Sequence, residues 1–235
     1  MDIKKAVILA GGQGTRLRPI TYEIPKALIP VHGKALSEHL LDLFKKYDIS
    51  EVYFAVGHMA DKIKKHFGNG KNFGLKIDYF VENGALGTAG PLADHKDELN
   101  ETFICTNGDE LKKIDLKKMY KQHKESGALV TIALKKVEDP SQYGVVRLDG
   151  NKILEFVEKP KKEEAPSNLI NSGLYMIEPQ VLDMIPKGHA MFEKDIFPKI
   201  AKLGKLYGFA FDGQWFDTGN MERYEQAIKE WIDIE

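Results

Sequence analysis

The chain has 235 residues, of which 43% are hydrophobic and 29% are charged, a composition typical of a soluble globular enzyme. Its 34 Lys and Arg side chains nearly balance 35 Asp and Glu, and this formal net charge of -1 argues against a long nucleic-acid-binding track. The single cysteine, Cys105, cannot form an internal disulfide, and the first apolar block is too short for a signal peptide or a membrane span. We therefore expect a cytoplasmic protein without nucleic-acid or membrane partners, and leave a homodimer open.

The first half of the chain alternates apolar blocks with amphipathic stretches. The apolar blocks predict buried strands over residues 6–10, 52–56, 76–80 and 102–106. The stretches 36–47 and 115–126 have helical periodicity, with Leu36, Leu40, Leu43 and Phe44 on one face of the first. This alternation favours a Rossmann-like, doubly wound α/β fold with a mostly parallel mixed sheet, in which ligands bind at the carboxyl ends of the strands.

The second half has a different pattern. Two alternating runs within 143–160 flank Asp149-Gly150-Asn151, which predicts a hairpin, and 169–177 predicts another strand. Residues 192–200 predict the start of an amphipathic helix, and 220–232 a closing helix. The seven histidines show no metal-ligand spacing, and we expect His39 and His123 at the surface or at the edge of the core.

A glycine-rich loop follows the first predicted strand, in "AVILAGGQGTRLRP" (6–19). A Walker loop requires Gly-Lys-Ser/Thr, and this loop lacks that lysine. The dinucleotide fingerprint G-x-G-x-x-G requires a third glycine where this chain has Leu17. Both familiar phosphate loops are therefore excluded.

The loop still has features of an anion site. Gly11, Gly12 and Gly14 allow the backbone to approach a ligand closely, and Arg16 offers a planar donor for phosphate. Lys26 follows between two prolines that restrict the backbone. The residues alone are equally compatible with a tight turn after a strand, with Arg16 and Lys26 in solvent.

A longer pattern distinguishes these alternatives. The segment "LAGGQGTRLRPITYEIPKALIPV" (9–31) resembles the pattern G-G-x-G-T-R-L-x-P-L-T-x-x-x-P-K-x-L-x-P-V of sugar-1-phosphate nucleotidyltransferases. Further blocks resemble that family in the same order: "ENGALGTAGPL" (82–92), "TNGDE" (106–110), "YGVV" (143–146), "VEKP" (157–160), "NSGLY" (171–175) and "WFDTG" (215–219). Within the family, "LGTAGPL" is most similar to mannose-1-phosphate guanylyltransferases and to guanylyltransferases of heptose phosphates.

The resemblance implies a nucleotide-diphospho-sugar transferase fold in a single catalytic domain over 1–235. Residues 1–135 would mainly bind nucleotide, 136–219 would form a small sugar-binding β subregion, and 220–235 the closing helix. The implied reaction is attack of a sugar 1-phosphate oxygen on the α-phosphorus of a nucleoside triphosphate, with release of pyrophosphate. Both reactants are anionic, so charge neutralisation and alignment are the main catalytic tasks.

The resemblance also assigns residues. It implies that Asp109 and Asp217 hold Mg²⁺, and that Arg16, Lys26 and Lys159 are catalytic. The implied nucleotide-binding residues are Leu9, Gly11, Gly12, Gly14, Thr15, Arg16, Lys26, Glu82, Gly87 and Thr88. The implied sugar-binding residues are Gly144, Glu158, Lys159 and Asn171.

Several of these residues have a second interpretation in the sequence. Asp109 sits in Asn-Gly-Asp, which is also turn chemistry, and Asp217 could cap the final helix. Glu158 and Lys159 are neighbours, and on a regular strand they would point to opposite faces. Both can reach one sugar only if the strand ends there, as Pro160 indicates. Glu110 either adds a second carboxylate near the metal or faces away.

Glu82 bears on the choice of base. Relatives that use UTP or dTTP commonly have glutamine five residues before the glycine equivalent to Gly87, where this chain has Glu82. A carboxylate only accepts hydrogen bonds, and guanine offers two adjacent donors, N1–H and N2–H₂. The prediction is therefore a guanylyltransferase acting on mannose 1-phosphate, although Glu82 could also lie exposed at a strand end. The alternatives are a uridylyl- or thymidylyltransferase acting on glucose 1-phosphate, and a catalytically silent regulatory subunit that binds nucleotide sugar.

Overall fold

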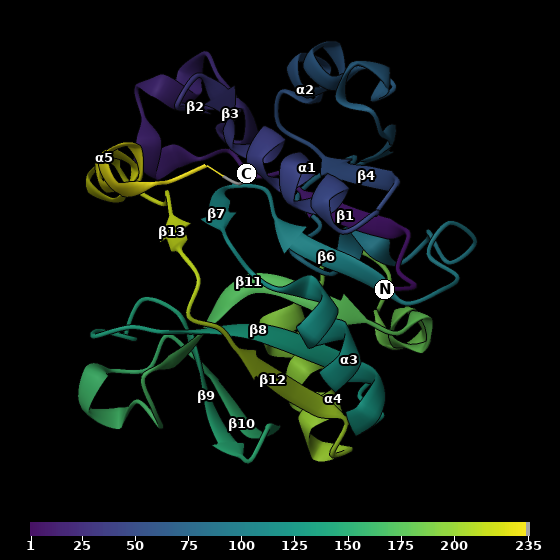
Figure 1. Ribbon diagram of the computed structural model, residues 1–235, viewed down its shortest axis with the longest axis vertical. Coiled ribbons are helices and arrows are strands. Elements are labelled where there is room, and N and C mark those ends of the chain that lie inside the picture. Colours follow the sequence, from purple (N-terminus) through teal and green to yellow (C-terminus); the bar gives the residue numbers. More distant parts are fainter. Residues whose placement is uncertain (234–235) are drawn as a thin grey trace. The chain divides into compact units, whose positions relative to one another are not determined.

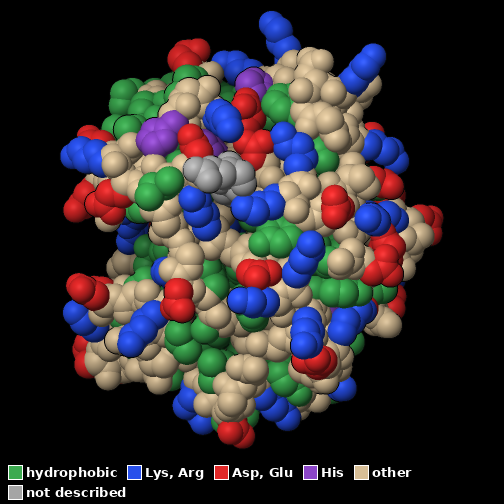
Figure 2. Space-filling model, viewed as in Figure 1, with side chains coloured by type: hydrophobic (Ala, Val, Ile, Leu, Met, Phe, Trp, Pro, Cys, Tyr) green, Lys and Arg blue, Asp and Glu red, His purple; other side chains and the backbone are tan. Residues whose placement is uncertain are grey.

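The computed structural model describes residues 1–233, so the last two residues of the expected segment 220–235 lie outside the described part. The chain forms two compact units, each discontinuous in sequence (Figure 1). The first contains residues 1–85, 105–114 and 213–233, and the second contains 86–104 and 115–212. No helix within residues 1–233 has the length and apolar character needed to cross a membrane. On the face shown in Figure 2, Lys and Arg are interspersed with Asp and Glu, as the balanced charge predicts.

A sheet in which β1 (Lys5–Leu9), β4 (Glu51–Val56) and β5 (Lys76–Val81) run parallel forms the centre of the first unit. The order of its strands is β5, β4, β1 and β6 (Phe103–Asn107), of which Cys105 onward belongs to this unit. Leu9 pairs with Ala55, which in turn pairs with Phe80, so the carboxyl ends of β1, β4 and β5 lie at one edge. These strands are the four predicted from apolar blocks. β1, β4 and β6 are largely buried, as near-continuous apolar sequences predict, but β5 alternates exposed and buried residues at the end of the row, so the expectation of a buried strand there is wrong.

Helices and two short ladders complete the first unit. These elements are α1 (Leu36–Lys46), α2 (Ala60–Phe67), α5 (Met221–Glu230), the pair β2 (Pro30–Val31) and β3 (Lys34–Ala35), and the pair β7 (Glu110–Lys112) and β13 (Trp215–Asp217). The predicted apolar face of α1 is buried. One hydrophobic cluster joins the glycine-rich segment, α1, β7 and α5: Leu17, Ile29, Val31, Leu36, Leu111, Tyr224, Ala227 and Trp231.

The second unit has a mainly antiparallel sheet. Its strands lie in the order β11 (Leu169–Ile177), β8 (Val130–Lys136), β12 (Leu206–Ala210), β10 (Lys152–Glu158) and β9 (Gly144–Asp149). Only β8 and β12 run parallel, and a further β9–β11 pairing links the two ends of this row. Helices α3 (Leu116–Ser126) and α4 (Phe197–Lys202) pack on it, and one π-helical turn, Phe192–Ile196, precedes α4.

The predicted α/β class with a mixed sheet is confirmed, and so is the β9–β10 hairpin, whose turn has Gly150 at φ +56°. The expectation for the two histidines is wrong. His39 and His123 are only 3% and 0% exposed. Their ring nitrogens have partners, Val31 O at 3.0 Å and Thr131 Oγ1 at 2.7 Å, which removes most of the cost of burying them.

Candidate active site

The glycine-rich loop leaves β1 at the carboxyl edge of the parallel strands. Gly14 has φ +61°, and a Cβ there would lie 2.9 Å from Thr21 Cγ2, so glycine is required. The Thr21 hydroxyl donates to the Gly14 carbonyl at 2.9 Å, and Leu17 is completely buried. At Gly12, in contrast, a Cβ would have no neighbour within 4 Å. The loop is thus anchored at its end and open at its centre, which suits binding of an anion by backbone amides.

Glu82 follows β5 and reaches this loop. Its backbone N–H donates to Val56 O at 2.8 Å, which continues the β4–β5 pairing. A Cβ added to Gly11 would lie 2.3 Å from Glu82 Oε1, so the carboxylate packs directly over the Gly11 backbone. Glu82 is half-buried there. The structure therefore excludes an isolated, exposed position at the strand end.

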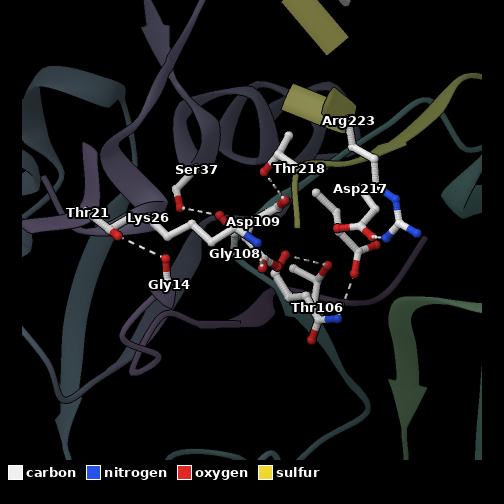
Figure 3. Close-up of polar contacts among 12 residues, drawn as sticks. Gly14, Thr21, Lys26, Ser37, Thr106, Gly108, Asp109, Asp217, Thr218 and Arg223 are labelled. Atoms are coloured by element: carbon white, nitrogen blue, oxygen red, sulfur yellow. Dashed lines mark hydrogen bonds and ion pairs between the residues drawn. The ribbon is translucent and has the colours of Figure 1, made fainter. Parts of the chain in front are cut away.

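Lys26 and Asp109 form an ion pair beside the loop (Figure 3). Their side chains are 12% and 35% exposed. Asp109 is in the turn between β6 and β7, where Gly108 N donates to Leu9 O at 2.9 Å and the Ser37 hydroxyl donates to Gly108 O at 3.2 Å. The turn is thus fastened to β1 and α1. Lys26 is held at the site, whereas Arg16 is exposed.

The charges around Asp109 keep it ionised. Partial burial works to raise the pKa of its carboxyl, but the ammonium groups of Lys26 and Lys112 and hydrogen bonding outweigh that effect, and the pKa lies below its ordinary value. Asp109 is therefore a carboxylate at neutral pH.

Asp217 comes from β13 and lies next to the Asp109 turn. In the β7–β13 ladder Asp217 pairs with Glu110, and the Thr218 hydroxyl donates to Asp109 O at 2.8 Å. The Asp217 carboxylate accepts from Arg223 Nη1 at 2.6 Å. Figure 3 shows these segments together in the first unit. Two carboxylates more than 100 residues apart in sequence are thus brought to one edge of that unit.

Asp217 does not cap the last helix. The side chain that accepts from the first turn of α5 is Asn220, which bonds Arg223 N at 2.9 Å. The alternative that Asp217 caps the final helix is therefore excluded. Arg223 is therefore held in the first turn of α5, with its guanidinium turned back to the Asp217 carboxylate.

Asp109 and Asp217 offer carboxylate oxygens, which are suitable ligands for a magnesium ion. Mg²⁺ prefers oxygen ligands and commonly takes one or two protein carboxylates, the remaining positions being water or phosphate oxygens. Within residues 1–233 no group of three or more His, Cys, Asp or Glu side chains is arranged to hold a metal ion. A site of two carboxylates completed by substrate phosphates fits this donor set, whereas an all-protein metal cage does not.

Gly87 and Thr88 lie in the second unit, where a loop packs on the π-helical turn. Gly87 has φ +79°, and a Cβ there would be 2.4 Å from Ala190 O. The Thr88 hydroxyl donates to Glu193 Oε2 at 2.7 Å and accepts from Phe192 N at 2.9 Å. The "LGTAGPL" segment is therefore fixed by its backbone and by one hydroxyl.

Glu158 and Lys159 end strand β10 in the second unit. Lys159 has φ +48°, so the strand stops at Glu158, and Lys159 Nζ lies 3.6 Å from Glu158 Oε1. Gly144 pairs with Glu158, and a Cβ there would be 3.0 Å from Glu158 Oε2. Burial and the neighbouring Glu193 raise the pKa of Glu158 above its ordinary value, despite Lys159. Both charged side chains can therefore face one ligand.

Asn171 sits at an irregularity in β11. Its Oδ1 accepts from Gly173 N at 2.9 Å, and its Nδ2 donates to Tyr175 Oη at 3.0 Å. The β8–β11 register shifts between Asn171 and Tyr175. The amide is thus oriented by its own strand and is half-buried.

The predicted residues fall into separate sets. In the first unit the structure groups the loop with Glu82, and Lys26 with Asp109 and Asp217. In the second it groups Gly144 with Glu158 and Lys159, and separately Gly87 with Thr88. Three residues at these positions were not singled out from the sequence. Thr218 lies within the "WFDTG" block, Arg223 follows that block closely, and Glu193 is in the predicted helix start.

The first unit thus combines an α/β sheet with a glycine-rich loop, a paired lysine and two carboxylates at one edge. The chain belongs to the Nucleotidyl transferase family, whose sequence model matches residues 5–233. It is 41% identical to a UTP–glucose-1-phosphate uridylyltransferase of Synechocystis over 96% of the chain and 62% of that protein. It is 38% identical to the mannose-1-phosphate guanylyltransferase catalytic subunit beta of Xenopus tropicalis over 98% of the chain and 68% of that protein.

A solved structure is also similar over almost the whole chain. It is a Bacillus anthracis protein assigned as a glucose-1-phosphate thymidylyltransferase, with a TM-score of 0.88, 29% identity, and coverage of 98% of this chain and 96% of that one. The expected fold type is therefore confirmed. The chain spans somewhat less than two thirds of the Synechocystis relative, at 62% of its length.

Proposed function

We propose that the protein is a sugar-1-phosphate nucleotidyltransferase. It joins the nucleotidyl group of a nucleoside triphosphate to a sugar 1-phosphate and releases pyrophosphate. The observation that carries this proposal is the grouping of Lys26, Asp109 and Asp217 beside an open glycine-rich loop in a member of the Nucleotidyl transferase family.

Positioning and charge neutralisation account for the chemistry. The backbone around Gly12 would receive the triphosphate, and Arg16, which is exposed next to the loop, would bind its phosphates. Lys26 would move part of its hydrogen bonding from Asp109 to the α-phosphate as negative charge develops there. Asp109 and Asp217 would hold Mg²⁺, which supplies neutralisation of phosphate charge when bound.

The second unit would bind the sugar 1-phosphate. Lys159 would pair with the phosphate, and Glu158 would accept hydrogen bonds from sugar hydroxyls with Asn171 and the Gly144 backbone beside them. The left-handed conformation of Lys159 supports this assignment, because it turns the two neighbouring charges out of strict strand alternation.

We further propose GTP as the triphosphate and mannose 1-phosphate as the acceptor. The Glu82 carboxylate over Gly11 can accept from both N1–H and N2–H₂ of guanine, and the Xenopus relative is named for this reaction. A uridylyltransferase that uses glucose 1-phosphate is the second candidate, because the Synechocystis relative carries that name at 41% identity.

A substrate panel tests the proposal. Purified protein with Mg²⁺ is incubated with GTP, UTP, dTTP or ATP, each with mannose 1-phosphate, glucose 1-phosphate or no sugar, and pyrophosphate is measured. We expect release that requires both a sugar 1-phosphate and Mg²⁺ and is fastest with GTP and mannose 1-phosphate. Release with UTP and glucose 1-phosphate alone would support the second candidate, and no release with any pair would contradict the enzyme assignment.

A further inference from the structure

The two candidate metal ligands are linked by a very small ladder. Strand β7 begins at Glu110, directly after Asp109, and β13 ends at Asp217. Each strand has three residues, and an isolated pair of such strands is unstable in water. The position of Asp217 relative to Asp109 therefore depends on what fixes this ladder.

One face of the ladder is ordinary hydrophobic core. Leu111 pairs with Phe216, Leu111 belongs to the cluster that joins α1 and α5, and Phe216 packs against it. Apolar packing of this kind holds the ladder against the core but has little directional preference. It does not by itself fix the small angles and shifts that a metal site requires.

The other face carries a buried polar network around Glu110. Oε1 of Glu110 accepts from Asn107 Nδ2 at 2.7 Å, and Oε2 accepts from Trp215 Nε1 at 2.8 Å. Lys112 Nζ lies 3.3 Å from Glu110 Oε2 and donates to Thr106 Oγ1 at 3.0 Å. Strand alternation puts this network on the same face as Asp217, the cross-strand neighbour of Glu110.

This network is not expected to contribute much to the folding stability of the protein. Glu110 and Lys112 are only 7% and 1% exposed, so both charges are withdrawn from water at a cost in free energy. Replacing a buried ion pair by apolar side chains of similar size is often neutral or stabilising. The network does fix the orientation of β13 relative to β7, because the hydrogen bond from Trp215 to Glu110 joins the two strands and requires a defined geometry.

We propose that Glu110 is a positioning residue, which, through Trp215, Asn107 and Lys112, sets the Asp217 carboxylate opposite Asp109 for a divalent cation. This inference rests on the proposed function, because it takes the two aspartates as the metal ligands. Glu110 acts through β13 and does not itself bind the cation.

Direct cation binding tests the proposal without relying on turnover. Mn²⁺ is titrated into the protein in the presence of the α,β-methylene analogue of GTP or, in parallel, of UTP. Free Mn²⁺ is measured by electron paramagnetic resonance. The variants are Trp215→Phe, which removes the indole N–H and also makes the aromatic ring smaller, and the double change Glu110→Leu with Lys112→Leu. The double change removes both buried charges and keeps the local net charge. Trp231→Phe is the matched control, because its N–H bonds Asp233 Oδ1 at 3.0 Å outside the network.

We expect the Mn²⁺ dissociation constant to rise about 3- to 10-fold in Trp215→Phe and at least about tenfold in the double variant, reflecting one and several lost charge-assisted hydrogen bonds. The melting temperature of the double variant should be at or above that of the wild type, and Trp231→Phe should bind Mn²⁺ within twofold of it. If the double variant does not fold, Trp215→Phe decides alone.

Two results overturn the inference and are distinguishable. In the first, the wild type binds Mn²⁺ and turns over substrate, and the Mn²⁺ dissociation constants of the variants lie within twofold of the wild-type value. This result refutes the positioning role and leaves the proposed function intact. A wild-type protein that binds no Mn²⁺ with either analogue refutes the metal assignment, and the positioning role with it.

Discussion

A single methyl group at Gly11 tests the role of Glu82. In Gly11→Ala the new Cβ would lie 2.3 Å from Glu82 Oε1, whereas ordinary contacts begin at 3.4 Å, so the carboxylate must move by the difference of about 1.1 Å. The obstructing atom is the end of a flexible side chain, and Gly11 does not have a positive φ. The fold should therefore tolerate the change while Glu82 leaves its position.

The expected effect is on base preference. A hydrogen bond to a charged group contributes about 1.5–3 kcal/mol, and 1.4 kcal/mol is a factor of ten, so the ratio of kcat/KM for GTP to that for UTP should fall by about 10- to 150-fold. The assay is pyrophosphate release with each triphosphate at a fixed concentration of sugar 1-phosphate.

Gly12→Ala is the matched variant, because it adds the same methyl with no neighbour within 4 Å. It should change kcat/KM for both triphosphates by similar factors and leave their ratio unchanged. A GTP-to-UTP ratio in Gly11→Ala equal to that of the wild type would refute the assignment of Glu82 to guanine. Equal loss of GTP and UTP use in both glycine variants would refute it too.

Three other predictions concern the metal ligands, a strained glycine and a buried histidine. Asp109→Asn and Asp217→Asn should each reduce kcat by about 100-fold or more. Neither change should lower the melting temperature by more than a few degrees. Near-normal pyrophosphate release in either variant would exclude that residue as a metal ligand. Gly87→Ala, with φ +79° and a Cβ 2.4 Å from Ala190 O, should lower the free energy of unfolding in urea by about 1–3 kcal/mol, and an unchanged midpoint would contradict that geometry. Burial lowers the pKa of His123 from 6.5, so below about pH 6.5 the unfolded chain binds a proton that the native chain does not. The free energy of unfolding should then decrease as the pH is lowered below about 6.5, by up to about 1.4 kcal/mol per pH unit, and His123→Gln should make this dependence weaker. Equal pH dependence in the wild type and in His123→Gln would show that His123 does not cause it.

The longer elements could be predicted because periodicity is a local property. The strand 169–177 is found with the bounds that the sequence predicts, and the hairpin turn is at Asp149-Gly150-Asn151 as expected. Buried strands with uninterrupted apolar residues and a helix with a clear apolar face carry their signal within about ten residues. Tertiary context was not needed to recognise them.

The short ladder at the site could not be predicted in the same way. Strands β7 and β13 have three residues each and are separated by more than 100 residues, so neither has a measurable period. Strands β8 and β12 and helix α2 were also not predicted. The ion pair between Asp217 and Arg223 and the network around Glu110 depend on that ladder and therefore become visible only in the structure.

The site itself was predicted in part. Pro160 indicated that the strand ends near Glu158, and the structure has that end at Glu158 with Lys159 left-handed. The alternatives of a solvated Lys26 and of an exposed Glu82 are excluded by their contacts. The catalytic, nucleotide-binding and sugar-binding roles stay predictions, since geometry shows which side chains are together but not which substrate they hold.

Nucleotidyl transfer is tested most directly by following the α-phosphate of the triphosphate. The protein is incubated with Mg²⁺, mannose 1-phosphate and GTP labelled with ³²P at the α position, and the products are separated by chromatography. We expect label in a nucleoside diphosphate sugar, with one pyrophosphate released per labelled product and no label transfer when the sugar phosphate is omitted. Label that stays in GTP, or appears only in GMP or GDP, with every triphosphate and sugar 1-phosphate tried would contradict this expectation.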